Sequence, residues 1–112
     1  MRTSSAKAKG RRLQDWVRDL LHTNTGFDGD DIRSAIMGET GADVKLTKRA
    51  TKKFPYSIEC KNQEVFKGIY KMYSQATSHE DKLEPLLIIK MNGKKPLVIL
   101  DAEYFIKENT YG

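Results

Sequence analysis

The chain has 112 residues, with 20 lysines and arginines against 15 aspartates and glutamates, which gives a formal net charge of +5. A chain of this length forms one small domain that buries enough surface to fold alone, and it has no room for a second. Hydrophobic residues make up 38% of it, but no apolar run is longer than a strand, and there is a single cysteine. These properties exclude membrane insertion and an internal disulfide, so we expect a globular intracellular protein.

The positive charge indicates a class of partner. Clusters of lysine and arginine gain affinity for nucleic acids by displacing counterions from the phosphate backbone. A basic protein that binds no polyanion has the same composition, so charge alone leaves both interpretations open.

Residues 1–12 are small, polar and basic and have no apolar periodicity. We predict a flexible basic arm here, which can follow a DNA backbone through Lys9, Arg11 and Arg12. A solvated tail that binds nothing in particular is the alternative. Residues 13–112 then form the single folded domain.

Apolar residues at helical spacing predict two helices. The first begins at Leu13 and ends before Asn24, and the spacing places Trp16 in the core. The second covers residues 64–78 and contains Gly68, which lowers helix propensity but permits close packing on a sheet.

The segment 56–62 alternates in the manner of a strand. Successive strand side chains point to opposite faces, so Ile58 and Cys60 share one face. Glu59 and Lys61 share the other. We therefore expect Cys60 to be a core residue and the two charged residues to stand together.

A neighbouring strand is predicted over residues 42–46. Val44 would face the core, and Asp43 and Lys45 would lie on the charged side. Asp43 is thus expected to converge with Glu59.

Basic residues also lie on either side of that strand. Residues 30–37 are compatible with a further strand around Arg33, and residues 47–54 form a basic connection that includes Lys48. Such a connection can meet phosphates, although a solvated hairpin tip is the alternative.

The last third of the chain predicts two short strands, residues 86–91 and 97–100, joined by the hairpin signal Asn92-Gly93. A final helix over residues 101–109 opens on an aspartate that suits an N-cap. The order is helix, three strands, helix, two strands, helix (αβββαββα). A helix between the third and fourth strands has the length of a parallel crossover, so we predict an α/β fold with a mixed sheet flanked by helices.

The charged face carries the residue types that phosphodiester hydrolysis requires. Asp43 and Glu59 are hard oxygen ligands that suit Mg²⁺ or Mn²⁺, and the backbone carbonyl of Cys60 is placed to complete the metal shell. Lys61 can orient the attacking water or stabilise developing charge.

Asp43, a gap of fifteen residues and then Glu59-Cys60-Lys61 resembles the motif of the PD-(D/E)XK nuclease superfamily. Gly41-Ala42 stands where that pattern often has a proline. The resemblance extends from Lys9 to Phe105. Within this superfamily, the chain is similar to small phage-encoded nucleases, and its order of elements is similar to that of archaeal Holliday junction resolvases.

The resemblance implies a restriction-endonuclease-like fold and a Mg²⁺-dependent DNA endonuclease that acts on branched or duplex DNA. It implies that Gln14 takes the place of a metal-binding glutamate on the first helix, with Asp15 as the alternative. It further implies that Gln75 on the second helix hydrogen-bonds Lys61 or a phosphate, unless it is an ordinary surface glutamine.

Symmetric cutting of a four-way junction requires two sites, so the resemblance also implies a homodimer, in the cytoplasm of a bacterial or phage-infected host cell. The sites it implies comprise the catalytic set Asp43, Glu59, Lys61 and Gln75, the metal ligands Asp43, Glu59, Cys60 (carbonyl) and Gln14, and the DNA contacts Lys9, Arg11, Arg12, Arg33, Lys45 and Lys48.

Three alternatives stay open at this point. The chain can be a homing or mismatch-type duplex endonuclease, or a DNA-binding module without catalysis on the same fold. The charged residues can also be the wet face of an ordinary sheet. His79 lies just past the second helix, and we interpret it as a polar residue at the helix end rather than as a general base.

Overall fold

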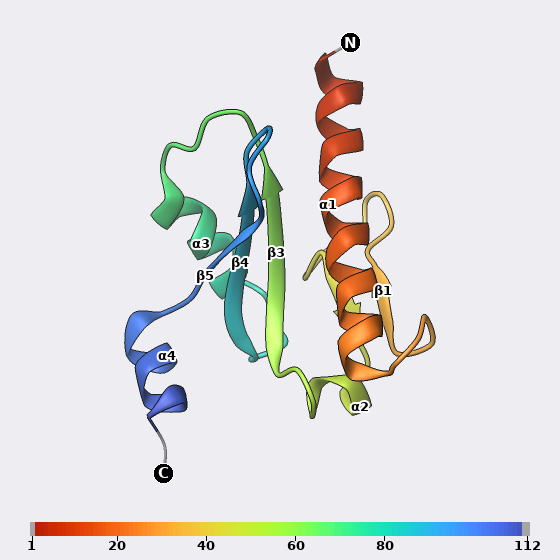
Figure 1. Cartoon of the computed structure of the whole chain (residues 1–112), viewed down its shortest axis with the longest axis vertical. Coiled ribbons are helices and arrows are strands. Elements are labelled where there is room, and N and C mark those ends of the chain that lie inside the picture. The colour runs from red at the N-terminus through yellow and green to blue at the C-terminus, as the bar shows by residue number, and fades with distance from the viewer. Residues whose placement is uncertain (1, 111–112) are drawn as a thin grey trace.

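The computed structural model describes the backbone of residues 2–110 and the side chains of residues 5–110. It has a mixed α/β architecture in which one long helix and one short helix lie on opposite sides of a five-stranded sheet (Figure 1). In chain order the elements are α1 (Arg2–Thr25), β1 (Ile32–Ser34), β2 (Val44–Leu46), α2 (Lys48–Thr51), β3 (Tyr56–Asn62), α3 (Ile69–Thr77), β4 (Glu84–Lys90), β5 (Leu97–Ile99) and α4 (Ala102–Asn109).

The strands follow one another across the sheet in the order β1-β2-β3-β4-β5. β3 and β4 are parallel, and the other neighbouring pairs are antiparallel. The parallel pair is connected through α3, because a chain that re-enters a sheet in the same direction needs a crossover of this length. The α/β class, the mixed sheet and the parallel connection predicted from the sequence are therefore confirmed.

The basic segment predicted as an arm is helical. α1 begins at Arg2 rather than at Leu13, so the described part of residues 1–12 is the first half of the helix. Alanine, lysine and arginine are strong helix formers, and they extend the helix although no apolar stripe marks it. Met1 lies outside the described residues.

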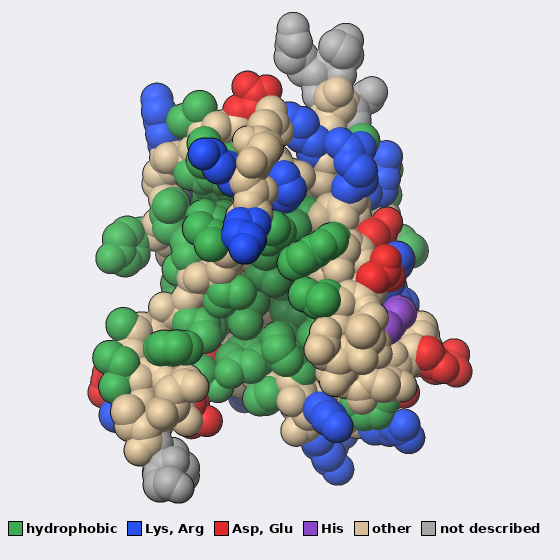
Figure 2. Space-filling model, viewed as in Figure 1, with side chains coloured by type: hydrophobic (Ala, Val, Ile, Leu, Met, Phe, Trp, Pro, Cys, Tyr) green, Lys and Arg blue, Asp and Glu red, His purple; other side chains and the backbone are tan. Residues whose placement is uncertain are grey.

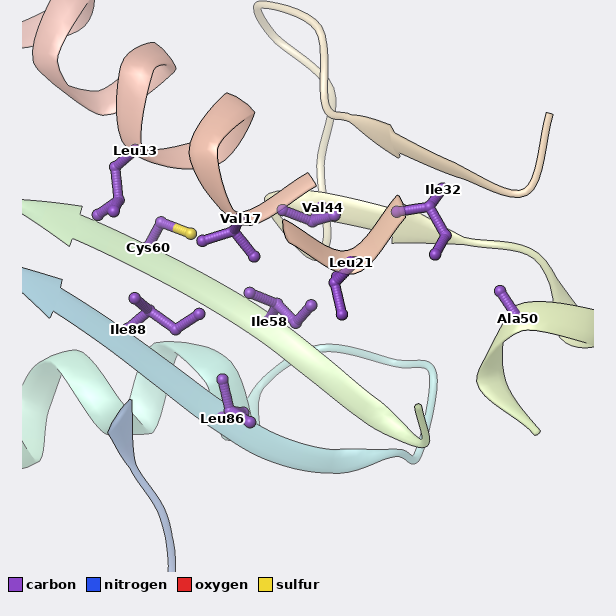
Figure 3. Close-up of a cluster of buried hydrophobic side chains, with 10 residues drawn as sticks. All are labelled: Leu13, Val17, Leu21, Ile32, Val44, Ala50, Ile58, Cys60, Leu86 and Ile88. Carbon is purple, nitrogen blue, oxygen red and sulfur yellow. The ribbon is translucent and has the colours of Figure 1, made fainter. Parts of the chain in front are cut away.

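The core lies between the second half of α1 and one face of the sheet (Figure 3). α1 contributes residues spaced by four, and the two central strands contribute alternate residues, as the helical and strand periods require. Cys60 belongs to this core, as predicted. The buried members of the cluster are Leu13, Val17, Leu21, Ile32, Val44, Ala50, Ile58, Cys60, Leu86 and Ile88.

Trp16 is not a core residue, contrary to the prediction. It is 47% exposed, as is Leu20, because an open groove separates this edge of the apolar stripe of α1 from β4 and β5. Both line an apolar groove of about 280 Å³ that continues to the exposed Leu97 and Val98 of β5. This groove forms the large hydrophobic area in the middle of the face drawn in Figure 2.

The second predicted helix starts later than its apolar pattern indicates. α3 begins at Ile69, and Gly68 is its N-cap with φ of 66°, a left-handed conformation that glycine adopts without a Cβ penalty. The basic connection after β2 contains the short helix α2, which Thr47 caps by accepting a hydrogen bond from the backbone N–H of Ala50. Within residues 2–110 no helix is both long and apolar enough to cross a bilayer.

Candidate functional site

Two carboxylates from neighbouring segments converge beside β3. Asp43 directly precedes β2, and its Oδ2 accepts a hydrogen bond of 2.8 Å from the backbone N–H of Cys60. Its own N–H donates to the carbonyl of Ile58 at 2.8 Å. These two bonds fix Asp43 against the middle of β3, next to Glu59.

Glu59 and Lys61 lie on one face of β3, as the alternation predicted. Glu59 is only 9% exposed, and its Oε2 lies 3.5 Å from Nζ of Lys61. Lysine and glutamate on an ordinary wet strand face would be solvated, so the burial of Glu59 contradicts the simple surface interpretation for this residue.

Both carboxyl groups are held in an environment that disfavours their charge. Burial is the main cause that raises the pKa of Asp43 above its usual value, and the N–H of Cys60 and the charge of Lys61 oppose it. Burial is also the main cause that raises the pKa of Glu59, and the nearby Asp43 adds to it. A cation bound between two such carboxylates would stabilise their charged forms.

His79 is a member of this cluster that the sequence interpretation missed. Its Nε2 lies 3.1 Å from Oε1 of Glu59, and its Nδ1 lies 2.5 Å from Oγ of Ser57. Ser57 in turn donates to Oδ2 of Asp81 at 2.7 Å. Ser57 and Glu59 are two residues apart in β3 and therefore point to the same face of the sheet, where both contact the imidazole of His79.

A signal for His79 was present in the predicted topology. A parallel crossover returns the chain to the starting end of the strand it left, which places the turn after α3 near Ser57. The helix pattern ends just before His79. The end of the helical pattern and the geometry of the parallel crossover together place His79 beside β3. Neither signal is sufficient alone.

A groove of about 720 Å³ opens at Asp43 between α1 and the loop that follows β1. Gln14 lies in it, on the same side of α1 as three basic residues at intervals of four or seven. Asp15 instead accepts hydrogen bonds from Ser34 and Arg18, so Gln14 is the one of the two that shares a groove with Asp43. The basic residues of the Asp43 groove are Lys7, Arg11, Arg18 and Arg33.

The mouth of the Asp43 groove carries an ion pair. Arg33 donates two hydrogen bonds to Glu39, of 3.0 and 2.8 Å, in the bidentate geometry of a guanidinium and a carboxylate. These bonds, with one from the N–H of Ile36, lower the pKa of Glu39 to about 2. Arg33 can therefore bind a phosphate only if its guanidinium leaves Glu39 or contacts Glu39 and the phosphate at the same time.

The other predicted DNA contacts lie in two further grooves. Lys9 and Arg12 line a groove of about 580 Å³ on the opposite side of α1, together with Trp16 and Asn62. Lys45 and Lys48 line a third groove of about 540 Å³, which His79 also borders. The structure therefore distributes the six predicted contacts over three surfaces.

Gln75 is exposed on α3. Its side chain makes no hydrogen bond to Lys61 within the described side chains, 5–110. Ala76, the next residue, is the one that this turn of α3 buries. In this conformation Gln75 is a surface residue and stands apart from the cluster of Asp43, Glu59, Lys61 and His79.

The donor set suits a cation that keeps part of its water shell. Among the described side chains, 5–110, no group of three or more histidine, cysteine, aspartate and glutamate residues is placed to bind a metal. A cation at Asp43 and Glu59 would therefore have two carboxylate ligands from the protein. The N–H and C=O of one strand residue point to the same neighbour, so the carbonyl of Cys60 faces Asp43, as its N–H does. Two carboxylates and a carbonyl are ligands that Mg²⁺ accepts.

No protein-family model, no curated protein sequence and no solved structure matches this chain.

Proposed function

We propose that this protein is a Mg²⁺-dependent DNA endonuclease of the PD-(D/E)XK type, with a restriction-endonuclease-like fold. The observation that carries the proposal is the partly buried Asp43 and the buried Glu59, both with raised pKa values, beside Lys61 and at the end of a basic groove. Burying two carboxylates together is costly in a structural role, whereas a metal-dependent site requires it.

Asp43, Glu59 and the carbonyl of Cys60 would hold the cation, and Gln14 is placed in the same groove to add a neutral oxygen. When bound, Mg²⁺ would supply Lewis-acid polarisation of the scissile phosphate. Mn²⁺ has the same ligand preference and is expected to substitute.

Lys61 has two tasks in this proposal. Its ammonium lies beside Glu59 and favours the ionised form of both carboxylates, which prepares them as ligands. It also places a positive charge next to the position where negative charge develops during phosphodiester hydrolysis.

The substrate proposed is DNA, with branched DNA as the first candidate. The N-terminal half of α1 carries basic residues on two nearly opposite sides, so one helix borders both the Asp43 groove and the Lys9 groove. Lysine and arginine there bind phosphates rather than base edges, which favours recognition of DNA shape over sequence. Figure 2 illustrates the gathering of basic residues where α1 begins.

Symmetric cuts require two copies, and we assign the apolar groove along β5 to the contact between them. β5 is an edge strand, and Leu97 and Val98 are more than half exposed. Antiparallel pairing of two β5 strands about Val98 would set Leu97 of each copy opposite Ile99 of the other, since each lies one residue from Val98. The paired surface would thus be apolar on both copies.

The proposal is tested with labelled four-way junction, linear duplex and single-stranded DNA, each incubated with Mg²⁺ or with chelator. The variant Glu59→Gln keeps the shape of the side chain and removes its charge. Glu103→Gln, on exposed α4, is a matched control at a remote carboxylate.

We expect Mg²⁺-dependent cutting by the wild type and by Glu103→Gln, and its loss in Glu59→Gln. Binding without cutting of any substrate would leave the non-catalytic DNA-binding alternative. Equal cutting of duplex and junction would favour the duplex endonucleases, of the homing or mismatch type, over a resolvase.

A further inference from the structure

The side chain of His79 is almost fully buried beside the site, and the proposed function assigns it no task. Its side chain is 8% exposed, and its ring contacts Glu59 on one side and Ser57 on the other. Ser57 is 1% exposed and is fixed by Asp81. The result is a continuous chain of polar contacts from the turn after α3 to the carboxylate of Glu59.

The hydrogen-bond donors in this chain can be counted. The hydroxyl of Ser57 has one proton, which it donates to the carboxylate of Asp81, because a carboxylate only accepts. The oxygen of Ser57 therefore accepts from Nδ1–H of His79. Nε2, on the other side of the ring, lies 3.1 Å from Oε1 of Glu59, which is within hydrogen-bond distance.

The contact leaves Glu59 free to bind a ligand. His79 occupies one lone pair of Oε1, and Lys61 approaches Oε2 at 3.5 Å. A carboxylate has about four acceptor positions, so the remaining ones are open to a cation. Without His79 the glutamate side chain would have more rotamers open to it, and ordering it again would reduce the affinity for the cation.

We infer that His79 is a positioning residue that fixes the carboxylate of Glu59 for a divalent cation through Nε2, and that Ser57 and Asp81 fix the imidazole in turn. The inference rests on the proposed function, because it takes Glu59 to be a cation ligand. Partners of this kind, which orient a ligand without touching the metal, typically contribute about 10- to 100-fold to metal affinity or activity.

Two substitutions of His79 separate its two contacts. In His79→Gln the amide nitrogen lies near the place of Nε2, so the contact with Glu59 is kept and the one with Ser57 is lost. In His79→Asn the amide group lies near the place of Nδ1, so the contact with Ser57 is kept and the one with Glu59 is lost. The two variants have the same polarity and a similar volume, so each is a control for the other.

The first measurement is Mn²⁺ binding to the DNA-free protein by calorimetry, with thermal unfolding in chelator alongside. We expect His79→Gln to bind within a few-fold of the wild type and His79→Asn to bind about 10- to 100-fold more weakly. Equal weakening in both variants, in step with their loss of thermal stability, would overturn the inference. A greater loss in His79→Gln would overturn it as well.

A second measurement uses the unmodified protein and does not depend on the folding of a variant. The chain has two histidines, and His22 contacts the carbonyl of Ile32, away from the cluster. Titration with Mg²⁺ should shift the imidazole ¹⁵N resonances of His79 and leave those of His22 in place. Unchanged His79 resonances at saturating Mg²⁺ would contradict the inference.

These measurements distinguish failure of the inference from failure of the proposed function. If the wild type cuts DNA and the two His79 variants bind Mn²⁺ equally, the function stands and the inference fails. If no DNA is cut but His79→Asn still loses Mn²⁺ affinity, the inference stands and the nuclease proposal fails. A wild type that binds neither Mn²⁺ nor Mg²⁺ would overturn both.

Discussion

The two faces of β3 are both buried, yet they have opposite chemistry. On the side of α1, Ile58 and Cys60 pack in an apolar core (Figure 3). On the other side, Ser57 and Glu59 are buried to a similar degree but contact His79 and other polar groups. A single strand thus contributes both the structural core and the candidate active site.

The difference separates two uses of burial. Apolar burial stabilises the fold in proportion to the area removed from water. Burial of Glu59 beside Asp43 does the reverse, because desolvation and mutual repulsion disfavour their charged forms. We therefore expect substitutions on one face to reduce stability and substitutions on the other to reduce activity, and the following predictions test that division.

The largest effect is expected from Glu59→Gln. It should lower the rate of DNA cutting by about 10²- to 10³-fold or more, since it removes a charged ligand from the proposed metal site. Circular dichroism and thermal unfolding should show a protein at least as stable as the wild type. A variant that cuts DNA at the wild-type rate would place the active site elsewhere.

On the opposite face, Ile58→Ala should lower the free energy of unfolding by about 2–5 kcal/mol, because Ile58 is fully buried and its truncation leaves a cavity. Chemical denaturation measures this loss. Folded protein at low temperature should still cut DNA within a few-fold of the wild type. A loss of activity without loss of stability would contradict the division between the faces.

The pH dependence of stability should also distinguish the faces. The pKa of Glu59 is raised in the folded protein, so between its usual value of 4.5 and the raised value the folded state binds more protons than the unfolded state. Stability of the metal-free protein should therefore fall as pH rises through that window. The melting temperature of Glu59→Gln should exceed that of the wild type by an amount that grows with pH and disappears with Mg²⁺.

Glu39 provides a contrast in sign. Its pKa is lowered to about 2 by Arg33, so its contribution to stability is present above its usual value of 4.5 and is lost as pH falls towards 2. Glu39→Gln should therefore reduce the acid sensitivity of the protein, whereas Glu59→Gln should act at higher pH. If both substitutions changed the pH dependence of stability in the same direction, the environments assigned to Glu39 and Glu59 would be wrong.

Association should depend on the apolar groove along β5. Leu97→Glu should convert a dimer to a monomer, measured as mass by light scattering after size-exclusion chromatography, because it places charge in that groove. Phe105→Glu, at an equally exposed residue outside the groove, is the control. A wild-type monomer at all concentrations would remove the homodimer from the proposal.

The smallest effect concerns Cys60. Burial, with Asp43 and Glu59 nearby, raises the pKa of its thiol, so the native protein should react slowly with thiol reagents at neutral pH. Unfolding should restore the ordinary rate. Fast labelling of the folded protein would mean that this face of β3 is open to solvent.

Features that depend on neighbours along the chain could be predicted from the sequence. The alternation of residues 56–62 predicted both faces of β3, and Asp101 caps α4 through the N–H of Tyr104, as its residue type indicated. The parallel pairing of β3 and β4 followed from the helix between them. Each of these is local chemistry or a short-range geometric constraint.

Which residues the sheet covers, and which distant residues meet, could not be predicted in this way. Trp16 belongs to an apolar stripe, but its burial depended on how closely β5 packs against α1, and an open groove lies between them. His79 reaches Glu59 because the crossover through α3 returns to the start of β3, twenty residues along the chain. Helical and strand periods report the contacts of one element with one surface, whereas these positions depend on how several elements pack together.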